Sequence, residues 1–158
     1  MPGVMTRSLL IVAHAPSSNT LRLRAAAAEG AGDPAVEGVA VTVLSPFDAQ
    51  PHHVKAADAL LLGTTENLGY MSGALKDFFD RCYYPCLEET QGRPYALYIR
   101  AGHDGTGTRR GVETIVTGLR WKAVQEPLIL RGAWDEAFVD RVRELGLYLA
   151  AGLEAGVF

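Results

Sequence analysis

Residues 64–81 read TTENLGYMSGALKDFFDR, and this stretch decides the predicted fold. An apolar run at 59–63, short enough for a buried strand, comes directly before it. Ser72 is placed to cap a following helix, whose apolar residues fall on one face at Leu75, Phe78, Phe79 and Cys82. A strand, a polar glycine-containing loop and a helix N-terminus in this order predict a ligand site at the edge of an open parallel sheet.

The rest of the chain alternates between strand and helix. Strands are expected at 8–13, 39–44, 59–63, 95–100 and 124–130. Helices are expected at 21–29, from Ser72 to near Tyr83 because Pro85 follows, at 109–120 and at 134–153. In the first helix Leu21, Ala25 and Ala28 should face inward, with Gly30 and Gly32 ending it. Residues 45–58 form an irregular crossover with a short helix or none. This pattern predicts an α/β, doubly wound five-stranded parallel sheet in the order 2-1-3-4-5.

Bulk composition bounds the class of protein. At 158 residues the chain fits a single domain over 1–158. The net charge of −3 is too mild to indicate a nucleic-acid partner, and no run is long enough to span a membrane. The apolar run at 9–12 is shorter than a signal peptide requires, so a buried first strand explains it better. Two cysteines give no disulfide framework, which favours the reducing cytoplasm.

In this strand order the loops after the first, third and fourth strands meet at one edge of the sheet. Ser17, Ser18, Asn19 and Thr20 stand at the start of a helix, where free N–H groups and hydroxyls favour a phosphate. Ordinary capping of the helix by Ser18 or Asn19 is the alternative.

The other two loops offer groups for a flat heterocycle. Residues 64–72 supply two threonine hydroxyls, the Asn67 amide and Tyr70, which either flanks an aromatic ring or packs at the helix entry. Glycines in residues 102–107 let the backbone approach a ligand closely. His103 is the candidate catalytic residue, as a proton relay, and a solvent-facing histidine is the alternative.

Other uses of this fold fit poorly. A dinucleotide site would require G-x-G-x-x-G after the first strand, and residues 14–20 contain no glycine. A phospho-accepting receiver domain would need acidic residues at the ends of the first and third strands, where Glu66 is the only nearby acid. Cys82 and Cys86 lack further ligands nearby, so we expect buried thiols and no metal site. His52 and His53 are expected at the surface, with a cofactor-proximal role as the weaker alternative.

Residues 69–81, GYMSGALKDFFDR, resemble the motif G-x-M-S-G-x-L-K-x-F-x-D-R of the flavodoxin-like superfamily, in its multimeric flavodoxin and NAD(P)H-dependent FMN or quinone reductase branch. The first loop is similar to that superfamily's S-x-S/T-G-N-T phosphate loop at Ser17, Asn19 and Thr20, and departs from it at Ala15 and Ser18. Strand 124–130, read without an insertion, resembles the short-chain form.

The resemblance implies a flavodoxin-like three-layer sandwich with FMN as cofactor. The implied cofactor-binding residues are Ser17, Ser18, Asn19, Thr20, Thr64, Thr65, Glu66, Asn67, Leu68, Gly69, Tyr70, Ala101, Gly102, His103 and Gly105. The expected function is an FMN-dependent oxidoreductase that uses NADPH or NADH as co-substrate and reduces a small-molecule acceptor, a quinone or a flavin. A flavodoxin-type electron carrier and a module that has lost FMN are the alternatives, and a homo-oligomer is left open.

Overall fold

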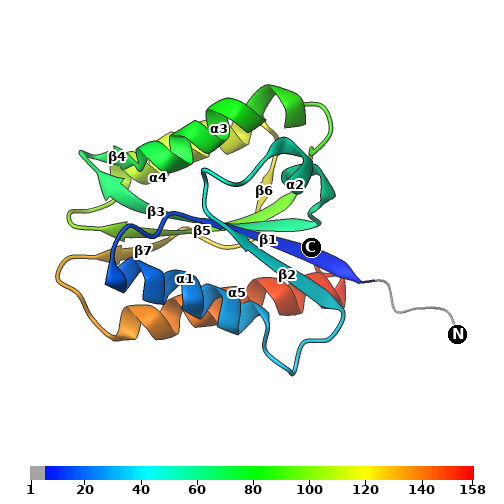
Figure 1. Cartoon of the computed structure of the whole chain (residues 1–158), viewed down its shortest axis with the longest axis horizontal. Coiled ribbons are helices and arrows are strands. Elements are labelled where there is room, and N and C mark those ends of the chain that lie inside the picture. Colours follow the sequence, from blue (N-terminus) through cyan, green and yellow to red (C-terminus); the bar gives the residue numbers. More distant parts are fainter. Residues whose placement is uncertain (1–5) are drawn as a thin grey trace, which may run out of the picture.

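Apolar runs of the sequence lie at the centre of the structure as parallel strands (Figure 1). The computed structural model describes residues 6–158. The parallel strands are β1 (Arg7–Ala13), β2 (Val39–Leu44), β3 (Ala59–Asn67), β5 (Pro94–Ala101), β6 (Lys122–Ala123) and β7 (Leu128–Arg131). They are ordered β2-β1-β3-β5-β6. β7 also pairs with β5, farther along β5 than β6 does. The fourth predicted strand is β5 and the fifth corresponds to β6 and β7, so the predicted order 2-1-3-4-5 is confirmed.

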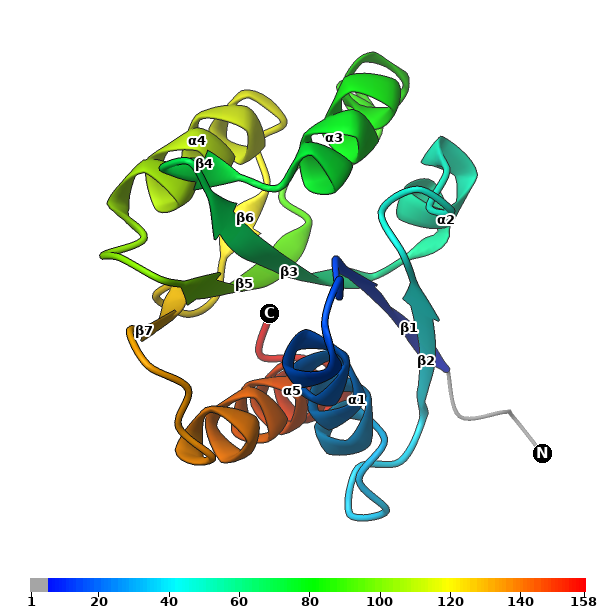
Figure 2. The ribbon, with the colours of Figure 1, turned by 60° about the vertical axis from the view of Figure 1, so that its left-hand side comes forward.

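Helices cover both faces of the sheet. They are α1 (Ser18–Ala31), α2 (Pro51–Ala56), α3 (Gly73–Cys86), α4 (Thr106–Gly118) and α5 (Ala137–Ala155). Figures 1 and 2 show α1 and α5 together on one face, with α2, α3 and α4 on the other. A separate apolar cluster fills each face, and the cluster beneath α3 contains the predicted inward residues Leu75, Phe78, Phe79 and Cys82. The structure is the flavodoxin-like three-layer sandwich that the sequence predicts. Within residues 6–158, none of the helices combines the length and apolar character needed to span a bilayer.

Glycine brings α1 and α5 into direct backbone contact. A Cβ atom at Gly30 would lie 1.9 Å from the carbonyl oxygen of Arg143, and one at Gly146 would lie 2.3 Å from that of Ala27. Neither site accepts a side chain unless the helices separate. The prediction that Gly30 ends the helix is wrong, because α1 continues to Ala31 and Gly32 forms its C-cap.

The predicted inward face of α1 is wrong at two of its three residues, whereas Ala28 is partly buried and packs against the apolar cluster on that face of the sheet, as predicted. Leu21 is 48% exposed and Ala25 is exposed, whereas Leu23, Ala26 and Ala27 are buried. Alanine is small enough to occur on either face of a helix, so its spacing in this segment does not mark the buried side.

The end of α3 also differs from the prediction. α3 continues through Pro85 to Cys86 instead of stopping near Tyr83. Pro85 removes the hydrogen bond that its position would donate to the Arg81 carbonyl oxygen, and α3 ends one residue later, so little helix beyond the proline is affected.

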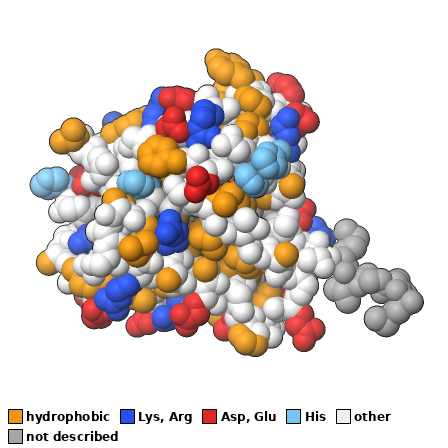
Figure 3. Space-filling model, viewed as in Figure 1, with side chains coloured by type: hydrophobic (Ala, Val, Ile, Leu, Met, Phe, Trp, Pro, Cys, Tyr) orange, Lys and Arg blue, Asp and Glu red, His pale blue; other side chains and the backbone are white. Residues whose placement is uncertain are grey.

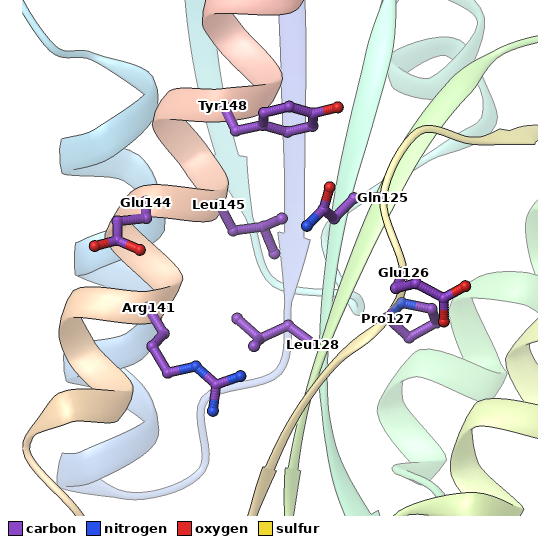
Figure 4. Close-up of a pocket in the computed structure, with 8 residues that line it drawn as sticks. All are labelled: Gln125, Glu126, Pro127, Leu128, Arg141, Glu144, Leu145 and Tyr148. Carbon is purple, nitrogen blue, oxygen red and sulfur yellow. The ribbon is translucent and has the colours of Figure 1, made fainter.

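The predicted strand 124–130 is split into β6 and β7. Between the pairs Tyr95↔Ala123 and Tyr98↔Leu128, the edge strand carries two more residues than β5 does. The extra residues, with Pro127 among them, bulge away from the sheet. A cavity of about 440 Å³ lies between this bulge and α5, with Leu128 and Leu145 on its apolar side (Figure 4). The uninterrupted strand expected from the short-chain form is therefore not found.

Candidate functional site

The first loop is short because α1 begins at Ser18. Ser17 caps the helix through a reciprocal pair of hydrogen bonds. The Thr20 N–H donates to the Ser17 hydroxyl over 3.2 Å, and the Ser17 N–H donates to the Thr20 hydroxyl over 2.9 Å. Capping therefore falls to Ser17 rather than to Ser18 or Asn19. The N–H groups of Ser18 and Asn19 have no hydrogen-bond partner within the described part of the chain.

The predicted loop at 64–71 is a β-hairpin. β3 extends to Asn67, and β4 (Tyr70–Met71) pairs with it antiparallel. Leu68 and Gly69 form the turn with φ values of 52° and 77°, as required in the tight turns that join hairpin strands. Leu68 is fully exposed at the tip, although a leucine adopts positive φ only at a cost.

The Glu66 carboxylate joins the hairpin to the loop after β5. One of its oxygens accepts the N–H of His103 and the other accepts the N–H of Gly105, each over 2.8 Å. Gly105 is the N-cap of α4 and has φ of 72°. The carboxylate therefore lies near the N-terminus of α4, where the helix dipole favours a negative charge. Bonds of this charge-assisted kind are the stronger class of protein hydrogen bond.

The loop after β5 is fixed at further points. Arg131 donates from Nε to the Asp104 carbonyl oxygen over 2.8 Å, and the Thr106 N–H donates to the Asp104 carboxylate. The pKa of Asp104 is lowered from its usual value, mainly by the hydrogen bond from the Thr106 backbone. His103 lies at the surface of this loop with its side chain exposed. Its main chain is thus anchored while its imidazole is free to meet solvent or a ligand.

β1 joins the same edge of the sheet. The His14 N–H donates to the Gly63 carbonyl oxygen over 3.0 Å, so the first loop begins beside the end of β3. The loops after β1, β3 and β5 are therefore brought together, as the strand order predicts (Figure 2). Gly63 has a packing reason as well, because a Cβ atom there would fall 2.3 Å from the ring of Tyr98.

The predicted site residues differ in how free their polar groups are. Thr64 is buried, accepts the Ser72 N–H over 3.0 Å and donates to the Thr65 carbonyl, so it supports the hairpin from within. Thr65 donates to the side chain of Asn67 over 2.8 Å. Both of these polar side chains lie at the partly exposed end of β3.

Tyr70 points toward α4. A Cβ atom at Gly111 would lie 2.4 Å from its ring, and one at Gly107 would lie 1.9 Å from the carbonyl oxygen of Gly69. These two glycines let the hairpin lie directly on the helix. Tyr70, which was predicted to flank a ring, therefore packs on α4, and 39% of it remains exposed.

The segment after β2 also reaches this edge, which the sequence did not predict. The ring of Phe47 is 59% exposed and lies edge-on to that of His14, with centroids 6.4 Å apart. Burial lowers the pKa of His14, and the nearby Arg24 lowers it further. Arg81 holds the segment in place by donating to the carbonyl oxygens of Pro46 and Ala49. No signal in the sequence pointed to this link, because the acceptors are main-chain atoms.

The two predicted cysteine and histidine pairs lie elsewhere. Cys82 and Cys86 are free and buried in α3, as predicted, and burial raises the pKa of Cys82 to about 12. His53 is half-buried and accepts the Gln50 N–H at the start of α2, whereas His52 is exposed. Neither pair belongs to the three loops.

FMN fits the free groups at this edge. The N–H groups of Ser18 and Asn19 point out of the first turn of α1, the position at which helices bind phosphate. Open space surrounds Gly69 and Gly102, where a Cβ atom would meet nothing within 4 Å. The main chain at these two glycines is therefore accessible to a ligand. The N–H groups of His103 and Gly105 are the exceptions, because Glu66 already binds them.

Comparison with solved structures finds the same architecture in several redox proteins. An archaeal flavodoxin shares 19% identity and superposes with a TM-score of 0.76 over 90% of this chain and 96% of its own. A WrbA-like flavodoxin from Agrobacterium tumefaciens shares 18% identity, with a TM-score of 0.75 over 96% of this chain and 99% of its own. Rubredoxin oxygen:oxidoreductase from Desulfovibrio gigas matches 97% of this chain with 38% of its own, at 12% identity and a TM-score of 0.77. At these identities the likeness shows the fold alone.

Comparison at the level of sequence is more selective. No curated protein sequence matches the chain. The family described as NADPH-dependent FMN reductase matches residues 48–135. That range holds β3, the hairpin, α3 and the loop after β5, and it is more than half of the 158 residues. The chain belongs to the NADPH-dependent FMN reductase family.

Proposed function

We propose that this chain is a single-domain cytoplasmic oxidoreductase that binds FMN, oxidises NADPH or NADH and reduces a quinone or a free flavin. The observation that carries the proposal is the junction at Glu66. It joins the hairpin and the loop after β5 into one wall, and both parts fall in the range that matches the reductase family. Family membership supports FMN and the oxidoreductase class, and the choice of coenzyme and acceptor belongs to the proposal.

The chain's own residues would bind and orient the cofactor. The N–H groups of Ser18 and Asn19 would hold the phosphate, with the Ser18 hydroxyl exposed beside them. Thr65, Asn67 and the main chain around Gly69 and Gly102 would border the ring. When bound, FMN supplies the transfer of hydride from the nicotinamide and of electrons to the acceptor.

His103 would act on protons. Its side chain is exposed on a loop whose main chain is held by Glu66, so it could meet a reduced acceptor without moving the loop. An imidazole can both donate and accept a proton, which suits it to such transfers.

The surface favours an enzyme over a one-electron carrier. Carriers that must find basic partners gain speed from a large acidic field. The net charge here is −3, and Figure 3 shows acidic and basic side chains interspersed on the face it presents. No field of a single sign covers that face.

The first experiment adds FMN to the purified chain and follows the flavin absorption band. Oxidation of NADPH and NADH is then measured with benzoquinone or free flavin as acceptor. The proposal expects saturable FMN binding and steady coenzyme oxidation that depends on FMN. Full FMN loading without oxidation of either coenzyme would refute the proposed enzymatic activity and would favour the alternative of an electron carrier.

A matched pair of variants tests the phosphate site. Ser18 is the first residue of α1, where proline is tolerated, and Ser17 before it already has the extended backbone that precedes a proline. Ser18→Pro removes the proposed N–H donor and should weaken FMN binding about tenfold, the effect of losing one charge-assisted hydrogen bond. Ser18→Ala keeps that N–H and should bind FMN nearly as the parent does. Equal affinities of the two variants for FMN would mean that the phosphate does not bind at the N–H group of Ser18.

A further inference from the structure

A groove lies between α3 and α4, directly behind the hairpin. Its first part is a cavity of about 370 Å³ whose lining includes Tyr70, Lys76, Gly107, Arg110 and Thr114. A second cavity of about 220 Å³ continues from it along α3 and shares Lys76. The first volume alone lies in the range of small-molecule sites. The groove is separate from the cavity of Figure 4, which lies against α5.

One wall of the groove is aromatic. The ring of Tyr70 is held against Gly111, since a Cβ atom at Gly111 would lie 2.4 Å from it. At the same time the side chain remains 39% exposed. A tyrosine that is fixed by packing and still open to solvent offers a surface on which a flat base can stack.

The charged groups of the first cavity are cationic, and the acidic residue of the groove, Asp80, lines the second cavity. Arg110 is exposed, and its guanidinium has no hydrogen-bond or ion-pair partner anywhere in residues 6–158. Lys76 donates to Asp80 over 2.7 Å, and its ammonium group retains further donors. No acidic residue lines the first cavity. A free guanidinium beside a lysine is suited to a phosphate group.

The groove continues into the proposed cofactor edge. Gly107 lines the groove and also touches the hairpin turn, because a Cβ atom there would lie 1.9 Å from the Gly69 carbonyl oxygen. A molecule that reaches over the turn at Leu68 and Gly69 would therefore enter the groove without leaving the surface.

We propose that this groove binds the phosphorylated adenosine end of the coenzyme, with adenine on Tyr70 and the 2′-phosphate held by Arg110 and Lys76. The inference rests on the proposed function, which requires a nicotinamide coenzyme at the neighbouring edge. It makes NADPH, which carries the 2′-phosphate, the preferred coenzyme over NADH.

The test is calorimetric titration of the FMN-supplemented chain with adenosine 2′,5′-bisphosphate and with adenosine 5′-monophosphate. The bisphosphate should bind the parent chain more tightly. Arg110→Glu should weaken its binding by about tenfold or more, because a charge-assisted bond is replaced by repulsion, while Arg110→Lys should keep most of the affinity. Arg141→Glu, on the far side in α5, makes the same change of net charge at another exposed arginine and should have no effect.

Several results would overturn the inference. They are the absence of bisphosphate binding to the parent chain, equal affinity for the two nucleotides, and a loss of binding in Arg141→Glu rather than in Arg110→Glu. In turnover, Arg110→Glu should raise KM for NADPH about tenfold and leave KM for NADH unchanged. Failure of the proposed function would look different, as a chain that binds the bisphosphate through Arg110 and oxidises neither coenzyme.

Discussion

The contact between Gly107 and the hairpin turn gives a prediction in which two effects compete. In Gly107→Ala the new residue favours the helix by up to about 1 kcal/mol over glycine. Its Cβ atom, however, would lie 1.9 Å from the Gly69 carbonyl oxygen, whereas real Cβ atoms stay at 3.0 Å or beyond. The hairpin or α4 must therefore move by more than 1 Å, and an adjustment of this kind costs about 1–3 kcal/mol.

The second effect should win because the hairpin has little freedom to yield. β4 is paired with β3, and Glu66 ties the end of β3 to the N-terminus of α4. We expect Gly107→Ala to lower the free energy of unfolding by about 1–2 kcal/mol and Tm by about 2–8 °C.

The assay is urea and thermal unfolding followed by circular dichroism. Gly73→Ala is the matched control, since Gly73 stands at the start of α3 and a Cβ atom there meets nothing within 4 Å. It should be as stable as the parent chain or more stable. If Gly107→Ala proves as stable as Gly73→Ala at an unchanged m value, the argument from the backbone contact is refuted.

Three more perturbations follow from single features. Leu68→Asn should raise the free energy of unfolding in urea by about 0.5–1 kcal/mol, because asparagine tolerates positive φ and the leucine side chain is fully exposed. A loss of stability would show that contacts hold Leu68 in place. Tyr98→Phe should be neutral or stabilising by up to about 1 kcal/mol, since the buried Tyr98 hydroxyl has no partner among residues 6–158; a clear thermal destabilisation would mean that the hydroxyl is satisfied. Burial raises the pKa of the Cys82 thiol from 9.0 to about 12, so the unfolded chain loses this proton at a lower pH than the folded chain does. The free energy of unfolding should therefore fall as pH rises above 9. Cys82→Ala should make this fall less steep, and an unchanged slope would contradict the prediction.

The strands and the core were predictable from the sequence because apolar runs carry the signal. β1 and β2 lie where the runs at 8–13 and 39–44 place them, and Leu75, Phe78 and Phe79 are buried as their spacing indicates. The face of α1 was not predictable in the same way, because its alanines fit either side and the decisive contact is made by Gly30. Tertiary contacts of this kind leave no periodic pattern.

The candidate site was predictable as a location more than as a set of free groups. The strand order alone brings the three loops together. The hairpin escaped prediction because leucine at 68 is an unusual residue for positive φ, so the sequence lacks the usual Asn-Gly signal. The bond between Glu66 and the loop after β5 was equally hidden, because its donors are main-chain N–H groups.

The bridge made by Glu66 bears on how a cofactor would load. Its carboxylate already immobilises the segment after β5, so the entropy of ordering that segment is lost during folding instead of on encounter with a ligand. Occupancy should then follow the supply of free cofactor rapidly and reversibly, without a slow closing step. The amide hydrogens of His103 and Gly105 should exchange slowly with deuterium even in the empty protein.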